Sequence, residues 1–490
     1  MNRAEMRRHL HRRRGIPWIP PIFVFVILLW IGSVLLLNTS LTEGMTWLGK
    51  SIFLVPPVLS TVLVSLTYPR EAFTFWVLII TVLVSQTGFQ AKVGEVTISA
   101  LELIIVGLVL ILFLVGWLGR TKIFRLRDLP GYKWLLVFIL YSVLVFIIGV
   151  IHGDSVPLAL IEFKGFIVYP LIIVLIIAGV GSERILFTAF YLMTGWFILL
   201  SGRGIMDFLT HAGENAVAPG FPVYRESAGY APINIFGATA MAMALLVFGV
   251  SFSSRISAAA AKVLRVIGVF LIVGGWTSAS RASVVLLVCG FSVLFLIKKQ
   301  MGLKLGVFIV ICGIVISVFI SPMVIKVPAR RIFQVSDSST KKRSFYLISG
   351  LHALKEFWPA GAGWGNAFWY SEREGLIRSD FIPWYHNDYL NLAVQTGIPG
   401  LILYLGFWFS LIRFLWKSVK DSPEEFREKP FTVGGMAALT GLLVSAMFEH
   451  FLWRPDMAGF VAWIAGMAVA DMRLREIPAE ADHEKNRLYR

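Results

Sequence analysis

Charged residues are scarce in this chain. Asp, Glu, Lys and Arg make up 15% of its 490 residues, while hydrophobic residues make up 57%. An ordinary soluble domain carries roughly 25% charged residues, and the mean hydropathy here is +0.76. The composition therefore excludes a typical soluble enzyme and predicts a polytopic membrane protein.

Cysteine is also scarce, with only Cys289 and Cys312, both inside apolar runs. This placement fits small buried residues better than a disulfide or a metal site, and it says nothing about the compartment. The chain has no His-Glu-x-x-His motif, no cysteine cluster and no Asp-x-Asp pair in the loops expected outside the cytoplasm. We therefore expect no metal and no other cofactor. The net charge of +16 comes without a nucleic-acid-binding motif.

Apolar runs recur along almost the whole sequence. A membrane-spanning helix needs about 20 mostly apolar residues, which gives about fourteen candidates, or twelve if the shorter ones are discounted. The predicted fold class is an all-α polytopic membrane protein with about 12–14 transmembrane helices and one large extracytoplasmic helical loop. The basic segment 1–14 precedes the first run without a cleavage site, so we expect a retained helix.

The distribution of Lys and Arg among the short loops predicts the orientation. Loops alternate between rich and poor in basic residues, and the rich loops are expected in the cytoplasm together with both termini. We predict one integrated domain: a transmembrane bundle over 1–320, an extracytoplasmic loop with amphipathic helices over 321–390, transmembrane helices over 391–472 and a cytoplasmic tail over 473–490.

The long loop contains its own helical pattern. Leu347, Ile348, Leu351, Leu354 and Trp358 recur at helical spacing. We expect an amphipathic helix that lies along the membrane surface. Three glycines between residues 361 and 365 then predict a tight turn.

Three arginines on the predicted outer side are candidates for binding an anionic group. Arg281 stands in a short polar turn between two apolar runs, where a charge costs about 3 kcal/mol or more unless it snorkels or finds a partner. Its guanidinium could face inward and bind phosphate oxygens in pairs, or it could snorkel to lipid headgroups. Arg225 could be an ordinary loop charge, and Arg343 could be an interfacial anchor.

His386 lies between Tyr385 and Asn387, where the outer loop re-enters the membrane. A single histidine is often a structural hydrogen-bonding group, but it is also the side chain best suited to proton transfer near neutral pH. The nearby aromatic residues and arginines favour the second interpretation.

The remaining charged groups in apolar surroundings are expected to form ion pairs. Lys164 lies beside Glu162 at a helix entrance, where we expect an intrahelical or interfacial ion pair. Glu449-His450 and Arg454-Pro-Asp456 lie in the last outer turn. We interpret the latter as ion pairs that close that turn.

At these positions the sequence resembles the O-antigen ligase and polymerase superfamily of bacterial inner membranes. The resemblance rests on four pieces in order: Arg225 with Gly229 and Asn234; Ser280-Arg281; residues 343–366, ending in Pro-Ala-Gly-Ala-Gly-Trp-Gly-Asn; and His386-Asn387 before Gly397 and Gly400. Two positions depart from the pattern, because Ile233 replaces a usual proline and Gln395 replaces a common acidic residue.

The resemblance implies a GT-C-like glycosyltransferase that moves a glycan from an undecaprenyl-diphosphate carrier to an acceptor at the outer face of the bacterial inner membrane. The acceptor would be lipid A-core in a ligase, or a carrier-linked glycan in a polymerase. The implied diphosphate-binding residues are Arg225, Arg281 and Arg343, the catalytic residues are His386 and Arg281, and the supporting residues are Asn387, Asn234 and Tyr385. The expected displacement is inverting and metal-independent.

Other functions stay open at this point. A transporter or flippase for lipid-linked glycans would need ionisable residues at mid-helix depth and matched broken helices. A protein O-oligosaccharyltransferase would use the same donor, and a scaffold in envelope assembly would not be catalytic. Membrane lipids are expected partners in every case, and nucleic acid in none.

Overall fold

The computed structural model describes residues 69–84, 90–93, 96–117, 127, 129–151, 156–210, 214–218, 221–225, 233–278, 280–297, 338–366, 385–420 and 429–476. The predictions for the basic amino-terminal segment, for the apolar run that ends near residue 320 and for the tail beyond residue 476 lie outside the described residues.

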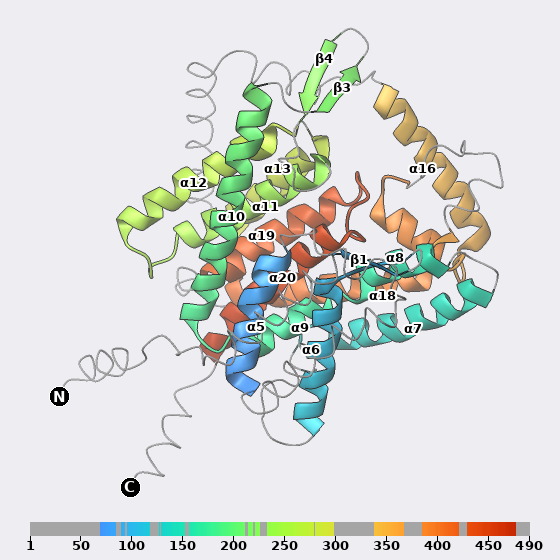
Figure 1. Cartoon of the computed structure of the whole chain (residues 1–490), viewed down its shortest axis with the longest axis horizontal. Helices are drawn as coiled ribbons and strands as arrows, with labels where there is room; N and C mark the ends of the chain where they lie inside the picture. Colours follow the sequence, from blue (N-terminus) through green and yellow to red (C-terminus); the bar gives the residue numbers. More distant parts are fainter. Residues whose placement is uncertain are drawn as a thin grey trace, which may run out of the picture.

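Helices dominate the described part of the chain (Figure 1). They are α5 (Pro69–Val84), α6 (Ala100–Trp117), α7 (Tyr132–Ile151), α8 (Val156–Ile167), α9 (Leu171–Gly179), α10 (Glu183–Leu209), α11 (Ile233–Ser251), α12 (Ala258–Trp276), α13 (Arg281–Ile297), α16 (Ser338–Phe357), α18 (Asp388–Lys420), α19 (Pro430–Ser445) and α20 (Pro455–Glu476). Two antiparallel hairpins accompany them, β1 (Gln90–Val93) with β2 (Val96–Ser99) and β3 (Glu214–Ala218) with β4 (Phe221–Arg225).

The predicted fold class, an all-α polytopic membrane protein, is confirmed. Seven described helical stretches are long and apolar enough to cross a membrane, and four shorter apolar helices accompany them. Helices satisfy their own backbone hydrogen bonds, which hydrocarbon cannot do for them. The predicted total of about 12–14 helices includes runs outside the described residues and stays a prediction.

The centre of the bundle is α11, which packs against α12, α13 and α19. Nearly all of its side chains are buried. Glycine allows close approach here: a Cβ added to Gly249 would lie 2.4 Å from the Cα of Gly434 in α19. Such small-residue contacts are typical of helix packing in membranes, where van der Waals contact is a main attraction.

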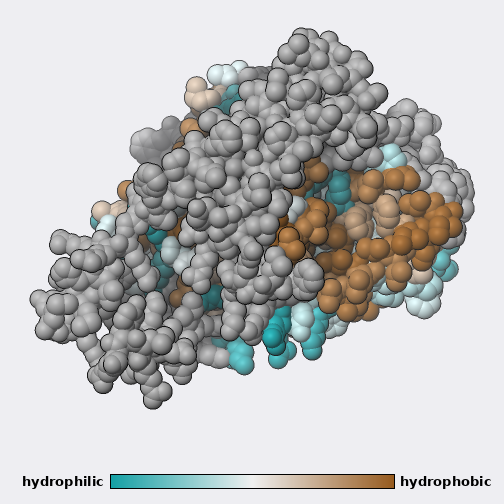
Figure 2. Space-filling model, turned by 60° about the horizontal axis from the view of Figure 1, so that its bottom comes forward, coloured by the Kyte–Doolittle hydropathy of each residue, from teal (hydrophilic) through white to brown (hydrophobic). Residues whose placement is uncertain are grey.

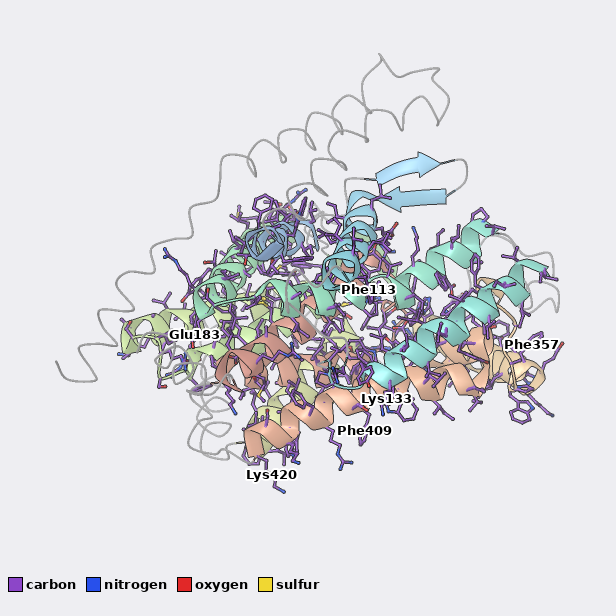
Figure 3. All side chains as sticks on the ribbon, turned by 90° about the horizontal axis from the view of Figure 1, so that it is seen from below. Phe113, Lys133, Glu183, Phe357, Phe409 and Lys420 are labelled. Carbon is purple, nitrogen blue, oxygen red and sulfur yellow. The ribbon has the colours of Figure 1, made fainter. Side chains whose placement is uncertain are left out.

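The outer surface of α7 and α18 is apolar. These two helices lie side by side in Figure 3, where Phe357 of α16 lies near one end of α18 and Lys420 at the other. Leu140 and Ile151 of α7 and Phe409 of α18 are 59%, 75% and 65% exposed. Figure 2 shows the corresponding hydrophobic area, which is the kind of surface that lipid covers in a membrane protein.

One helix boundary differs from the sequence pattern. The apolar run of α10 ends near residue 201, where a polar loop is expected, but the helix continues to Leu209. The start of α18 agrees with the sequence, in which residues 387–395 predict a short helix that ends at the turn Thr-Gly-Ile-Pro-Gly. α18 begins at Asp388 and contains a break at Gly397 (φ 70°, ψ 174°), two residues before Pro399. The first half of α18 is therefore a short helix outside the apolar run.

The amphipathic helix predicted in the long loop is α16. Phe345, Ile348 and Leu351 are about half exposed, whereas Ala353 and Leu354 pack against α18. One face of α16 thus holds the start of α18, and the other presents apolar side chains outward, as expected of an interfacial helix.

Candidate active site

Several helix ends meet on one side of the bundle. A Cβ added to Gly290 of α13 would lie 3.1 Å from the Ala437 carbonyl oxygen of α19, and one added to Gly441 would lie 2.4 Å from the Leu286 carbonyl oxygen. These contacts make α13 and α19 antiparallel, so α13 begins where α19 ends.

The start of α11 lies at the same end. A Cβ added to Gly237, one turn into α11, would lie 2.7 Å from the Oγ of Ser283 in the first turn of α13. Asn234, in the first turn of α11, and Arg281, the first residue of α13, are therefore neighbours of the α19–α20 loop.

Glu449, in the α19–α20 loop, connects three of these elements. Its Oε1 lies 3.1 Å from Nδ1 of His386, and its Oε2 accepts a hydrogen bond from Nη2 of Arg343 in α16 at 2.8 Å. The side chain of Asn234 hydrogen-bonds the same carboxylate. A carboxylate only 6% exposed thus joins residues far apart in the sequence.

The electrostatics of this cluster favour an ionised Glu449. Burial alone would raise the pKa of Glu449, but the hydrogen bond with His386 and the positive charge of Arg343 outweigh it and hold the pKa below its ordinary value. A stable carboxylate beside Nδ1 fixes the orientation of the imidazole and holds a proton on Nδ1. The lone pair of the neutral ring then lies on Nε2.

His386 itself has the geometry of a functional residue. Its φ angle is +50°, in the left-handed region that non-glycine residues seldom adopt and that clusters at functional sites. The ring packs on Tyr346 of α16, with centroids 5.5 Å apart, and its side chain is 35% exposed. Among the described residues, no second residue hydrogen-bonds the ring, and Nε2 has no partner there.

Asn387 and Tyr385 position the start of α18. The Asn387 side-chain oxygen accepts the backbone N–H of Leu390 at 3.0 Å, as an N-cap does. Tyr385 is buried, 1% exposed, and packs with Ala353 of α16 and Val394 of α18.

The glycine-rich turn and the break in α18 form one unit. Because Pro399 has no N–H and Gly397 leaves helical geometry, the carbonyl groups before the break lose their helical partners. The turn supplies replacements: Ala362 N–H donates to the Val394 carbonyl at 2.8 Å and Gly363 N–H to the Gln395 carbonyl at 3.0 Å. Residues 358–366 and 394–398 are therefore interlocked.

Gln395 completes this unit with its side chain. The Oε1 atom accepts the N–H of Gly365 at 2.9 Å, and the Nε2 atom donates to Glu162 of α8. An acid at this position, which the family pattern favours, would place two carboxyl groups together. The departure at Gln395 thus has a physical reason in this chain.

The three arginines predicted to bind a diphosphate lie in different environments. Arg343 is paired with Glu449, a partner that the sequence did not indicate. Arg281 begins α13 behind Ser280, whose side chain accepts the N–H of Ser283 at 3.4 Å. Arg225 ends β4 opposite Glu214, and its side chain lies outside the described residues. Their shared role in binding a diphosphate stays a prediction.

Sequence reasoning missed the role of Glu449. It was expected to close the last outer turn with a local ion pair; Arg454 and Asp456 do so, at 3.4 Å, but Glu449 is paired with residues from other segments. Its position beside His450, in a short loop between two apolar runs, was the available signal. Lys164 does form an ion pair, with Glu102 at 2.9 Å.

No group of three or more His, Cys, Asp and Glu side chains within the described ranges is arranged to hold a metal ion. No curated protein matches the chain. Residues 266–405 match the family model described as O-Antigen ligase. The match includes Arg281, Arg343 and His386, while Asn234 and Glu449 lie outside it. The resemblance seen in the sequence is therefore confirmed: this multi-pass membrane protein matches the O-antigen ligase family over residues 266–405.

Proposed function

We propose that the protein transfers a glycan from an undecaprenyl-diphosphate carrier to a hydroxyl acceptor at the outer face of the bacterial inner membrane. The observation that carries this proposal is the Glu449–His386 pair, which leaves Nε2 of the imidazole open beside helix ends that carry arginines. The match of residues 266–405 to the O-antigen ligase family supports a lipid-linked glycan as the donor.

In the proposed reaction, Nε2 of His386 accepts the proton of the acceptor hydroxyl. The acceptor oxygen forms a bond to the anomeric carbon as the bond from that carbon to the phosphate oxygen breaks, with inversion. Glu449 stabilises the imidazolium that forms. The negative charge that develops on the departing diphosphate is balanced by Arg281, with Arg225 and Arg343, so no divalent cation is required.

Glycan transfer by the purified protein in vesicles tests the site. His386→Ala and Arg281→Ala should each lower transfer by at least about 100-fold, the lower range for loss of an acid–base group. His352→Ala is the matched control, because His352 is an exposed histidine of α16. Near-normal transfer by both site variants would reject the assignment. Adding or omitting lipid A-core separates ligase from polymerase, since longer glycans on the carrier alone indicate a polymerase.

A transporter of lipid-linked glycans is the second candidate. Two membrane spans are interrupted, between α8 and α9 and within α18. Glu102 and Glu162 are also buried carboxyl groups. Broken helices and buried charges are typical of transporters. Movement of the labelled donor between leaflets, without any new glycosidic bond, would favour this function over transfer.

A further inference from the structure

A second His–carboxylate pair lies beside the first. His386 is paired with Glu449, and two residues after His386 the side chain of Asp388 is paired with His450, the residue that follows Glu449. Asp388 Oδ1 lies 2.9 Å from Nδ1 of His450, and both side chains are 1% exposed. Each segment thus contributes one imidazole and one carboxylate, and the two pairs cross between the start of α18 and the α19–α20 loop.

Asp388 also fastens the loop on both sides of Glu449. Its backbone N–H donates to the Ala446 carbonyl at 3.0 Å. Its Oδ2 accepts the N–H groups of Phe451 and Leu452 at 3.1 and 3.0 Å. A single buried residue therefore fixes the loop on both sides of Glu449, with its backbone before Glu449 and with its side chain after it.

His450 is also held in place by an aromatic contact. The ring stacks on Trp453, with centroids 5.4 Å apart and planes 23° apart. This aromatic contact keeps the imidazole buried against Asp388 rather than in solvent. With both of its flanks fixed, the Glu449 carboxylate has little freedom to leave Nδ1 of His386.

We propose that Asp388 and His450 are positioning residues for the transfer reaction, which act by holding the Glu449 carboxylate against His386. The proposal rests on the proposed function in that His386 is taken as the base. It adds a second requirement: the contact between Asp388 and His450 must be intact for the His386 imidazole to keep the productive tautomer.

The test compares Asp388→Asn, His450→Ala and His450→Asn in the full-length protein in vesicles. Asp388→Asn and His450→Ala should lower kcat by about 10–100-fold, as expected when an orienting partner is lost, with the KM for the donor nearly unchanged. His450→Asn should recover most of the loss, because its amide can donate to Asp388 from near the position of Nδ1. If Asp388→Asn does not fold, the two His450 variants still decide.

A double-mutant cycle separates positioning from general destabilisation. If Asp388 acts through Glu449, then Asp388→Asn should cost little further activity in a Glu449→Gln background. Arg454→Gln is the matched control, because it breaks another ion pair of the same loop and should leave kcat nearly unchanged. Additive losses, a raised KM with normal kcat, or full activity of folded Asp388→Asn would overturn the proposal.

Chemical modification of His386 gives a readout that does not depend on transfer. The rate of diethylpyrocarbonate labelling, followed by mass spectrometry, should differ between Asp388→Asn and the native protein, and it should change in the same direction as in Glu449→Gln. Absence of transfer by the native protein would reject the proposed function, while unchanged labelling in Asp388→Asn would reject the positioning role. The two failures are thus distinguishable.

Discussion

Replacement of Glu449 by glutamine is the most direct perturbation of the site. Glutamine has the same shape, but it offers one acceptor oxygen and one donor NH₂ where the carboxylate offers two acceptors. Oε1 and Oε2 of Glu449 face His386 and Arg343 respectively. The NH₂ group must therefore face one of two donors, and if it faces His386 it drives the proton onto Nε2.

The expected loss of stability in Glu449→Gln depends on how far its two partners, His386 and Arg343, are exposed to water. A hydrogen bond to a charged group contributes about 1.5–3 kcal/mol. The side chains of Arg343 and His386 are 29% and 35% exposed, so water replaces part of what is lost and we expect a stability loss of about 1–2 kcal/mol. The effect on kcat should be larger, about 10²–10⁴-fold, because the base loses its tautomer.

The assay is steady-state transfer from carrier-linked donor, with thermal unfolding measured on the same samples. We expect kcat to fall while the donor KM changes little, since Glu449 acts through His386 rather than on the diphosphate. Glu356→Gln, at an exposed acid of α16, is the matched control. A folded Glu449→Gln protein with kcat within about three-fold of the native value, far below the range for loss of a general base, would refute the role of the pair.

Three further predictions concern stability and cofactors. Burial lowers the pKa of His450 below its ordinary value of 6.5, so the native state binds fewer protons than the unfolded state and thermal stability should fall as the pH drops below 6.5. Stability should fall further below pH 4.5, because the pKa of Glu449 is also lowered and its carboxylate is then protonated. His450→Asn should reduce the loss of stability that begins at pH 6.5. Gly361→Ala should lower the free energy of unfolding, measured by chemical denaturation, by at least about 1–2 kcal/mol, because Gly361 has φ +84° and a Cβ there would lie 2.2 Å from the Gln395 carbonyl oxygen. Gly181→Ala is the control and should leave the free energy of unfolding unchanged, because a Cβ at Gly181 meets open space. Transfer should continue in the presence of a chelator such as EDTA, and its loss with recovery on adding a divalent cation would contradict the arginine-based mechanism.

Sequence patterns predicted the helices whose formation depends only on their own residues. The apolar runs predicted most of the described membrane helices, because any helix that crosses the hydrocarbon core needs about 20 apolar residues. The spacing from Leu347 to Trp358 likewise predicted α16. The sequence also predicted the short helix before the Thr-Gly-Ile-Pro-Gly turn and the apolar helix after it, but not that the two form one interrupted helix.

The parts that could not be predicted depend on distant partners. Glu449 meets His386 across 63 positions and Arg343 across 106. A charged pair in a short turn looks the same whether its partners are local or distant, and only the helix packing decides. Sequence patterns could therefore nominate His386 and the arginines by residue type, but they could not assign the carboxylate that orients the imidazole.

Two sets of contacts on the first half of α18, those of Asp388 and those of the glycine-rich turn, explain how His386 is kept in a strained conformation. A left-handed conformation at a non-glycine residue costs about 1–3 kcal/mol and persists only where the surroundings over-determine it. His386, with φ +50°, stands before a half-helix that is held by Asp388 at its start and by the glycine-rich turn at its end, across residues 394–398. The conformational cost at His386 is thus met by contacts on both sides of it along the chain. Mutations in the turn should consequently affect His386 through α18, although the turn makes no contact with the imidazole among the described residues.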